Sequence, residues 1–184
     1  MLSLILEYIM EIAQDYLKEC FDYNPDTGSL KWKARDVSHF KTLNAASVWN
    51  SKYANTEVGT LKSGRKILSL DGKKHKVHRI IWIICHGQSP ENHIDHINGN
   101  PEDNRLENLR DVTNAENHKN RKIPKTNTSG VHGVSWYKRK QKWQAMIRTS
   151  GGHLHLGYFD SLDEAAKARK EAEKLHGYHV NHGR

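Results

Sequence analysis

The polar residues between positions 95 and 117 include the side chains that hydrolysis of a phosphodiester bond requires. Asp95 and His96 are adjacent, and Asn108 and Asn117 follow in the same stretch. The reaction needs a deprotonated water, a hard cation at the phosphate and groups that hold both. The carboxylate of Asp95 suits Mg²⁺. The imidazole of His96, with an ordinary pKa of about 6.5, suits a general base at neutral pH.

The surrounding residues predict the elements that position this cluster. Thr113 and Glu116 form a capping box, which predicts a helix that begins at Asn114. Asn117 then lies in the first turns of that helix, from which its side chain can point back at the loop of Asp95. Because a helix turns by about 100° per residue, only one of Asn117 and its neighbour His118 can point into the site. We therefore expect strand, loop, strand and helix around one metal ion.

The composition favours a nucleic-acid partner and several small modules. The 184 residues include 29 Lys and Arg against 21 Asp and Glu, a net charge of +8, and such a basic balance attracts polyanions. Hydrophobic residues make up 36%, which is lean for one large core. The two cysteines, Cys20 and Cys85, are far apart, which excludes a disulfide framework or a four-cysteine zinc ribbon and fits a reducing, intracellular setting. We expect no membrane span and, since the apolar start carries Glu7 and no basic residues, no secretory signal.

The segments before the cluster give clear local signals except in one region. Residues 2–21 space their apolar side chains by three and four, which predicts an amphipathic helix. Turn residues at 24–28 precede a short strand at 30–32, whereas residues 35–56 have no period and are expected to be irregular. Asp71-Gly72 predicts a hairpin between strands at 66–70 and 73–77. The apolar run at 80–85 fits a strand or a helix, and the glycine after His86 favours the helix.

The pattern changes after the polar, basic stretch 121–130, which we interpret as a linker or extended arm. Alternating residues predict strands at 142–149 and 153–159, with a first strand at 131–136. A capping box at Ser161 and Glu164 predicts the start of a helix. The apolar side of this helix should cover one face of the sheet, and it consists of Ala165, Ala168, Ala172 and Leu175. The opposite face is then exposed and carries Gln144, Arg148, His153 and His155.

Residues 59–121 resemble the HNH nucleases, and specifically the phage homing-endonuclease branch with the ββα-metal fold. The resemblance rests on Val77-His78-Arg79, on Asp95-His96, on the run from Asn104 to Arg110, and on Asn117. It implies that Asp95 and Asn117 ligate Mg²⁺ or Mn²⁺, that His96 is the general base, and that Asn108 orients the loop and the histidine. Many HNH nucleases have histidine as the third residue of the HNH motif, where this chain has Asn117. The phage branch has asparagine there too, so Asn117 is preferred over His118 as the metal ligand. The segment Phe21–Trp32 is also similar to the lead segment of those phage proteins.

The C-terminal segment resembles the plant ethylene-response-factor, or Apetala-type, DNA-binding domain. The similar stretches are Ser129–Trp136, Lys142–Ala145, Leu156–Asp160 and the helix at Glu164–Ala166. That domain lays a three-stranded sheet in the major groove, which implies DNA contacts from His132, Tyr137, Arg148, His153 and His155. We expect the basic cluster before it to bind phosphates through Lys119, Arg121, Lys122 and Lys125.

The expected fold class is therefore α+β, with a ββα-metal HNH nuclease core plus a small three-stranded antiparallel sheet with one packed helix. The expected segments are an N-terminal helix and irregular lead (1–58), the nuclease domain (59–121), a basic linker (122–129) and the Apetala-type domain (130–182). We expect a site-directed endonuclease of the homing type, phage-encoded and monomeric, that cuts double-stranded DNA in the host bacterial cytoplasm with one divalent metal ion. Whether it cuts one strand or both is left open. The alternative is a sequence-specific DNA-binding regulator with an inactive HNH module, against which the presence of all four cluster residues argues.

Overall fold

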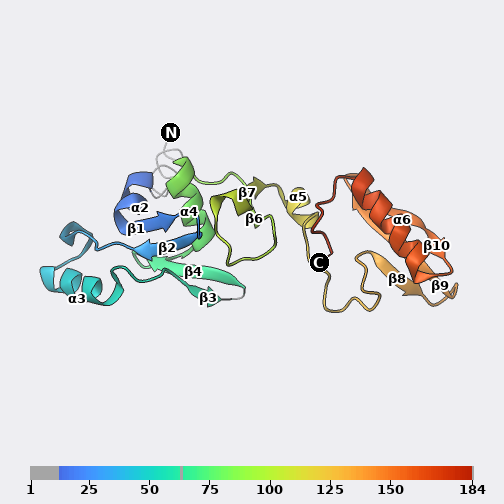
Figure 1. Cartoon of the computed structure of the whole chain (residues 1–184), viewed down its shortest axis with the longest axis horizontal. Coiled ribbons are helices and arrows are strands. Elements are labelled where there is room, and N and C mark those ends of the chain that lie inside the picture. Colours follow the sequence, from blue (N-terminus) through green and yellow to red (C-terminus); the bar gives the residue numbers. More distant parts are fainter. Residues whose placement is uncertain (1–12, 63, 184) are drawn as a thin grey trace, which may run out of the picture. The chain divides into compact units, whose positions relative to one another are not determined.

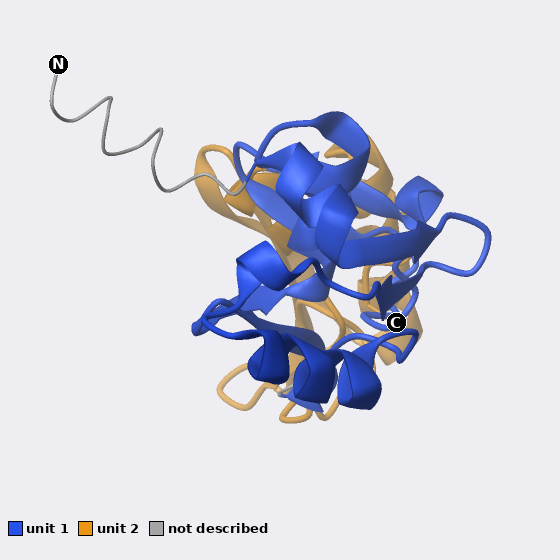
Figure 2. Ribbon diagram, turned by 90° about the vertical axis from the view of Figure 1, so that its left-hand side faces the viewer, with its two compact units in different colours: residues 1–112 blue, residues 113–184 orange. Residues whose placement is uncertain are grey.

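The computed structural model describes residues 13–62 and 64–183. The chain forms two compact units, residues 1–112 and 113–184 (Figure 2). Both combine helices with antiparallel strands, which confirms the α+β class (Figure 1). No helix within the described residues is long and apolar enough to cross a membrane.

The first unit begins with a helix and a hairpin. Helix α2 (Gln14–Cys20) agrees with the end of the predicted helix at 2–21, of which residues 2–12 lie outside the described residues. Strands β1 (Phe21–Asn24) and β2 (Ser29–Trp32) pair around the predicted turn, which confirms the strand predicted at 30–32. At the end of this turn, Gly28 adopts a left-handed conformation with φ of 72°.

The expectation of irregular structure at 35–56 is wrong. A short 3-10 helix, η1 (Val37–His39), is followed by helix α3 (Leu43–Tyr53). The Oγ1 of Thr42 caps α3 by accepting a hydrogen bond from the Ala45 amide at 3.1 Å. Ala46 is the one fully buried residue of α3, so its apolar side is too narrow to give a helical period in the sequence.

A three-stranded sheet follows in the order β3 (Thr60–Lys62), β4 (Arg65–Leu70) and β5 (Lys73–Lys76). Asp71 and Gly72 both have positive φ, of 50° and 78°, as the predicted two-residue hairpin requires. Helix α4 (Val77–His86) comes next and ends at Gly87 in the left-handed conformation, so the apolar run is helical as expected.

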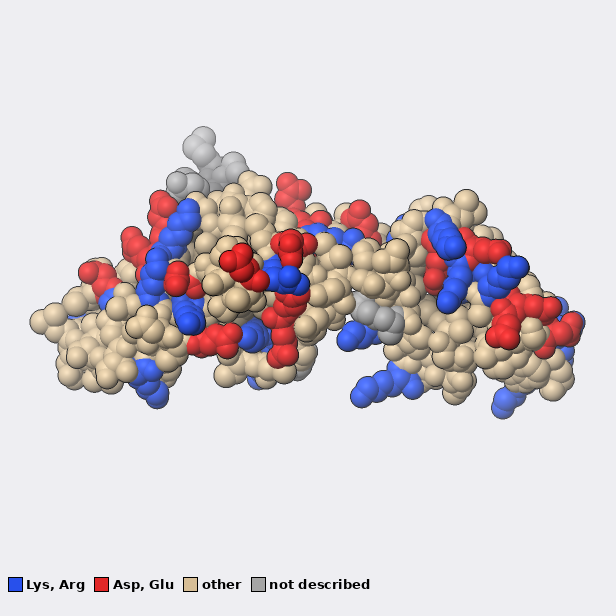
Figure 3. Space-filling model, in the orientation of Figure 1, with Lys and Arg blue, Asp and Glu red and all other residues tan. Residues whose placement is uncertain are grey.

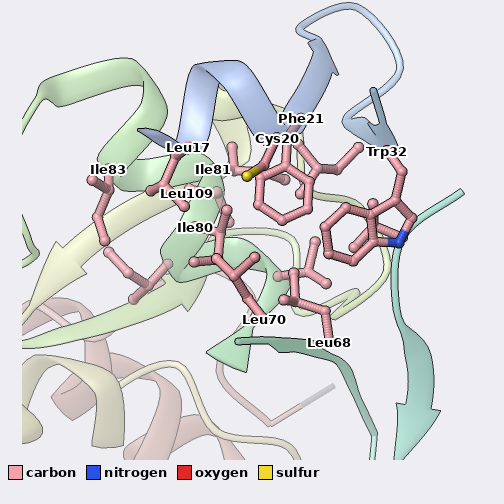
Figure 4. Packing of buried hydrophobic residues seen from close by; sticks show 14 residues of the cluster. Leu17, Cys20, Phe21, Trp32, Leu68, Leu70, Ile80, Ile81, Ile83 and Leu109 are labelled. Atoms are coloured by element: carbon pink, nitrogen blue, oxygen red, sulfur yellow. The ribbon is translucent and has the colours of Figure 1, made fainter. Parts of the chain in front are cut away.

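One core holds the first unit together. Side chains from α2, β1, β2, β4, α4 and β7 (Leu109–Val112) point toward one another in Figure 4. Leu17, Phe21 and Leu30 of the predicted lead segment share this core with Ile80 and Ile94 of the predicted nuclease segment. The lead segment thus packs as part of the first unit, and the four-segment division stays a prediction.

The second unit begins with α5 (Asn114–His118), whose capping box at Thr113 and Glu116 is formed as predicted. Its sheet has the order β10 (Gly152–Phe159), β9 (Lys142–Thr149) and β8 (Val134–Tyr137), and α6 (Leu162–Leu175) packs on all three strands (Figure 1).

The packing of α6 differs in part from the predicted apolar side. Ala165 and Ala172 are buried as expected, but Leu175 is 82% exposed. Arg169 is instead buried, and its guanidinium donates to the Met146 carbonyl at 2.6 Å and pairs with Glu173 at 2.8 Å. The central strand therefore receives a paired cation rather than another apolar side chain.

Candidate active site

His96 ends strand β6 (His93–His96), which pairs with β7 in antiparallel register. The buried side chain of Ile94 anchors the strand in the core, and His96 itself is only 1% exposed. The strands β6 and β7 are joined by a loop that includes the short 3-10 helix η2 (Leu106–Asn108). The arrangement of strand, loop and strand agrees with the predicted order.

The side chain of Asn108 holds this loop closed. Its Oδ1 accepts from the backbone amide of Asn98 at 2.9 Å, and its Nδ2 donates to the carbonyl of Asp103 at 2.7 Å. The backbone carbonyl of Asn108 also accepts from the amide of Ile97 at 2.9 Å. Asn108 is therefore placed to orient the loop that follows His96.

A charged pair reinforces the same loop. The guanidinium of Arg105 donates to both carboxylate oxygens of Asp103, at 2.9 and 2.8 Å. These hydrogen bonds lower the pKa of Asp103 to about 2. Asp103 is thus ionised at neutral pH and also accepts from the Asn98 side chain at 2.7 Å.

Polar groups lie at both ring nitrogens of His96. Its Nδ1 is 3.0 Å from the Arg65 guanidinium, and its Nε2 is 3.0 Å from Oδ1 of Asn104. The ring of His78 stands edge-on with its centroid 5.2 Å away. Burial lowers the pKa of His96; Arg65 lowers it further, and the hydrogen bond with Asn104 opposes both. The imidazole is therefore neutral at pH 7, the form that can accept a proton.

Asp95 is also buried, beside His96 but paired across the sheet. It stands opposite Arg110 in the β6–β7 register, and the Arg110 guanidinium contacts its Oδ2 at 2.9 Å. The buried carboxylate therefore has a cationic partner within hydrogen-bond distance. Arg110 is a partner that the sequence interpretation did not assign.

Asn117 and His118 lie on α5, in the second unit. Asn117 is half-buried, whereas His118 is exposed and its Nδ1 accepts from the Arg121 guanidinium at 3.0 Å. The choice of Asn117 as a metal ligand stays a prediction of the resemblance.

The divalent cation that the resemblance implies needs oxygen ligands at this site. Within residues 13–62 and 64–183 no three His, Cys, Asp or Glu side chains gather in a way that could hold a metal ion. Mg²⁺, however, commonly takes one or two protein oxygens and completes its shell with water and substrate phosphates. One buried carboxylate, that of Asp95, fits such a weakly ligated site.

The predicted DNA-binding residues of the second unit lie in two places. Tyr137, Arg148, His153 and His155 share the sheet face opposite α6, where the β9–β10 register sets Arg148 beside His153. His132 precedes β8 and instead packs against His182, with ring centroids 4.4 Å apart. Tyr158 joins the first group, 4.5 Å from the His155 ring and beneath the Lys140 ammonium. The sequence interpretation did not assign Tyr158 or Lys140 to this face.

The basic cluster is partly engaged within its own unit. Lys119 donates to the carbonyl of His176 at 2.7 Å, and Arg121 bonds His118. Lys122 and Lys125 are exposed. All four stay predicted phosphate ligands.

The β3–β4–β5 sheet of the first unit carries a second basic surface, which the sequence analysis did not predict. Pairing of Lys62 with Arg65 in β3–β4, and the alternation of side chains along β4 and β5, bring four cations to the sheet face opposite the buried Leu68 and Leu70. We name this the basic face, and it consists of Lys62, Arg65, Lys74 and Lys76. The three strands contain no Asp or Glu. Acidic and basic side chains are otherwise mixed over both units in the view of Figure 3.

Comparison with known proteins bears on this site. A family model described as HNH endonuclease matches residues 75–119, which include Asp95, His96, Asn108 and Asn117. Protein 3.8 of Escherichia phage T7 is 36% identical over 106 residues, which cover 57% of this chain and 88% of protein 3.8. The chain belongs to the protein 3.8 family.

Within this family, the chain carries an HNH endonuclease domain. An uncharacterized HNH endonuclease of Acanthamoeba polyphaga mimivirus is 32% identical over 106 residues, which cover 52% of this chain but 27% of the viral protein. No solved structure matches the chain. An HNH endonuclease domain implies a nuclease that acts on DNA, and HNH nucleases generally depend on a divalent metal ion.

Proposed function

We propose that this member of the protein 3.8 family is a divalent-metal-dependent endonuclease of the homing type that cuts double-stranded DNA, with His96 as general base. The observation that carries the proposal is the buried imidazole of His96, which directly precedes a loop closed by Asn108. Burial also lowers the pKa of His96, which favours the neutral form that a general base needs. The adjacent carboxylate of Asp95 supports the proposal, because both groups stand at the end of one strand.

In the proposed reaction, His96 takes a proton from a water whose oxygen attacks phosphorus. The new P–O bond forms as the bond to the 3′ oxygen breaks, and that oxygen takes a proton from solvent. A divalent cation, when bound, supplies positive charge for the leaving oxygen; Asp95 would hold it, with Asn117 as the second ligand that the resemblance adds.

Arg65 acts before this step. Its guanidinium donates to Nδ1 of His96, so it must leave before that nitrogen can accept a proton. A phosphate oxygen is a stronger acceptor for a guanidinium than a neutral imidazole is. We propose that DNA binding draws Arg65 onto the phosphodiester backbone and so uncovers the base.

Two surfaces are proposed to bind the duplex. The basic face belongs to the first unit and includes Arg65, which connects it to His96. In the second unit, the sheet face with Arg148, His153 and His155 is proposed to read DNA in the manner of the Apetala-type domain. The Lys119–Lys125 cluster would add phosphate contacts.

The test compares His96→Ala and Asp95→Asn with His93→Ala, an exposed histidine on the same strand. Each protein is incubated with phage and plasmid DNA in Mg²⁺ or Mn²⁺, and affinity is measured on the same preparations by gel shift. We expect the first two variants to lose cleavage while affinity stays within a few-fold, and the control to cleave normally. Cleavage by His96→Ala at the wild-type rate would refute the assignment, and DNA binding without cleavage by the unmodified protein would favour the regulator.

A further inference from the structure

Asn104 lies in the loop between β6 and η2, and the proposed reaction does not yet use its side chain. The residue is 2% exposed, and its Oδ1 lies 3.0 Å from Nε2 of His96. Its Nδ2 donates to the carbonyl of Glu102 at 3.3 Å. Because a carbonyl only accepts, this second bond fixes which end of the amide faces the histidine. The oxygen faces Nε2, so Nε2 must carry the hydrogen.

The contact at Nδ1, the other ring nitrogen of His96, independently indicates that the hydrogen is on Nε2. The Arg65 guanidinium, 3.0 Å from Nδ1, has donors and no acceptor. Nδ1 must therefore present its lone pair. An acceptor at one nitrogen and a donor at the other fit only the neutral tautomer with hydrogen on Nε2.

We propose that Asn104 is a positioning residue that fixes the ring and the tautomer of His96, so that Nδ1 is the atom that accepts the proton from water. This inference rests on the proposed role of His96 as general base. Loss of the amide oxygen would let the ring rotate and let the Nδ1–H tautomer, which cannot accept at that atom, become populated.

The first unit also holds the backbone of Asn104 in place. The hydroxyl of Tyr23 on β1 donates to the Asn104 carbonyl at 3.1 Å. A Cβ built on Gly28, in the β1–β2 turn, would lie 2.6 Å from the Asn104 carbonyl carbon, so this turn packs directly on the segment. The β1–β2 hairpin therefore packs on the backbone of Asn104 and helps to hold its side chain against His96.

The experiment reads the tautomer directly in the full-length protein. With ¹⁵N-labelled histidine, and His96→Gln to assign the signal, the two ring nitrogens of His96 are distinguished by NMR at a pH where the ring is neutral. We expect hydrogen on Nε2 in the unmodified protein and a mixture of tautomers in Asn104→Leu. Hydrogen on Nδ1 in the unmodified protein would overturn the inference without any variant.

Kinetics complete the test. We expect Asn104→Leu to lower the single-turnover cleavage rate by about 10- to 100-fold with little change in DNA affinity. Asn104→Asp keeps an oxygen at Nε2 and should restore both the tautomer and part of the rate. If His96→Ala retains cleavage, the proposed function fails. If His96→Ala is inactive while Asn104→Leu keeps the rate and the tautomer, only the role of Asn104 fails.

Discussion

Replacement of Gly28 by alanine should destabilise the first unit more than the matched replacement of Gly72 by alanine does. Gly28 has φ of 72°, and its missing Cβ would stand 2.6 Å from the Asn104 carbonyl carbon and closer still to the Arg105 amide nitrogen. Both atoms belong to the backbone, so neither can rotate away. Gly72, in the β4–β5 hairpin, has a similar φ of 78° but no atom within 4 Å of its built Cβ.

The two glycines separate the conformational cost from the steric cost. A residue with a Cβ in the left-handed region costs about 1–2 kcal/mol, and Gly72→Ala should show that cost alone. Gly28→Ala should add about 1–3 kcal/mol, because the added methyl group must displace packed backbone. We therefore expect a loss of about 2–5 kcal/mol at Gly28. The loop of Asn104 would move with it, so cleavage should also slow in the fraction that remains folded.

The assay is amide hydrogen exchange in α4, which reports the free energy of unfolding of the first unit without a signal from the second. Each variant is compared with the unmodified protein, and single-turnover cleavage is measured under conditions where both variants are folded. Equal losses of stability in the two variants, or normal cleavage by Gly28→Ala, would refute the claim that this turn supports the loop.

Three further results are expected. Burial lowers the pKa of His78 to about 3, whereas the unfolded chain takes up a proton near pH 6.5; this group should therefore lower stability by about 2 kcal/mol from pH 7 to pH 5. In His78→Phe, α4 exchange should lose that contribution, and the contribution of buried His96 should remain. Replacing the three lysines of the basic face with serine should weaken DNA binding and reduce the slope of log affinity against log salt by about 2.7, a value that titrations between about 50 and 200 mM salt would check. Arg169→Met should cost about 3–5 kcal/mol by thermal or denaturant unfolding of the second unit, because it removes the guanidinium that pairs with Glu173 and donates to the Met146 carbonyl, whereas the exposed neighbour Lys170→Met should cost little.

Local signals in the sequence predicted those elements that depend on neighbouring residues. Both capping boxes form, because each needs only a hydroxyl and a carboxylate three residues apart. Asp71-Gly72 makes its turn because both residues tolerate positive φ. Helix α3 was missed because one alanine accounts for its fully buried surface, so tertiary contact and the cap at Thr42 decide its structure.

The residues of the candidate site likewise include some that the sequence alone indicates and some that only the folded structure reveals. Residue types and spacing singled out Asp95 and His96 as candidates, and the resemblance added Asn108. The contact of Arg65 with His96 joins residues 31 positions apart on strands of two different sheets, which no local pattern reports. Asn104 stood in a recognisable motif, but its partner becomes visible only when the loop is closed.

The position of His96 explains why the nuclease segment needs the residues before it. A buried imidazole stays neutral but must be held by groups that satisfy both ring nitrogens, or its burial becomes costly. The HNH model begins at residue 75, whereas Arg65, Tyr23 and Gly28 precede it. The core likewise joins Leu17 and Phe21 to Ile94 on the strand of His96. The matched segment thus contains the proposed catalytic groups, and the preceding hairpin and sheet supply the contacts that fix their geometry.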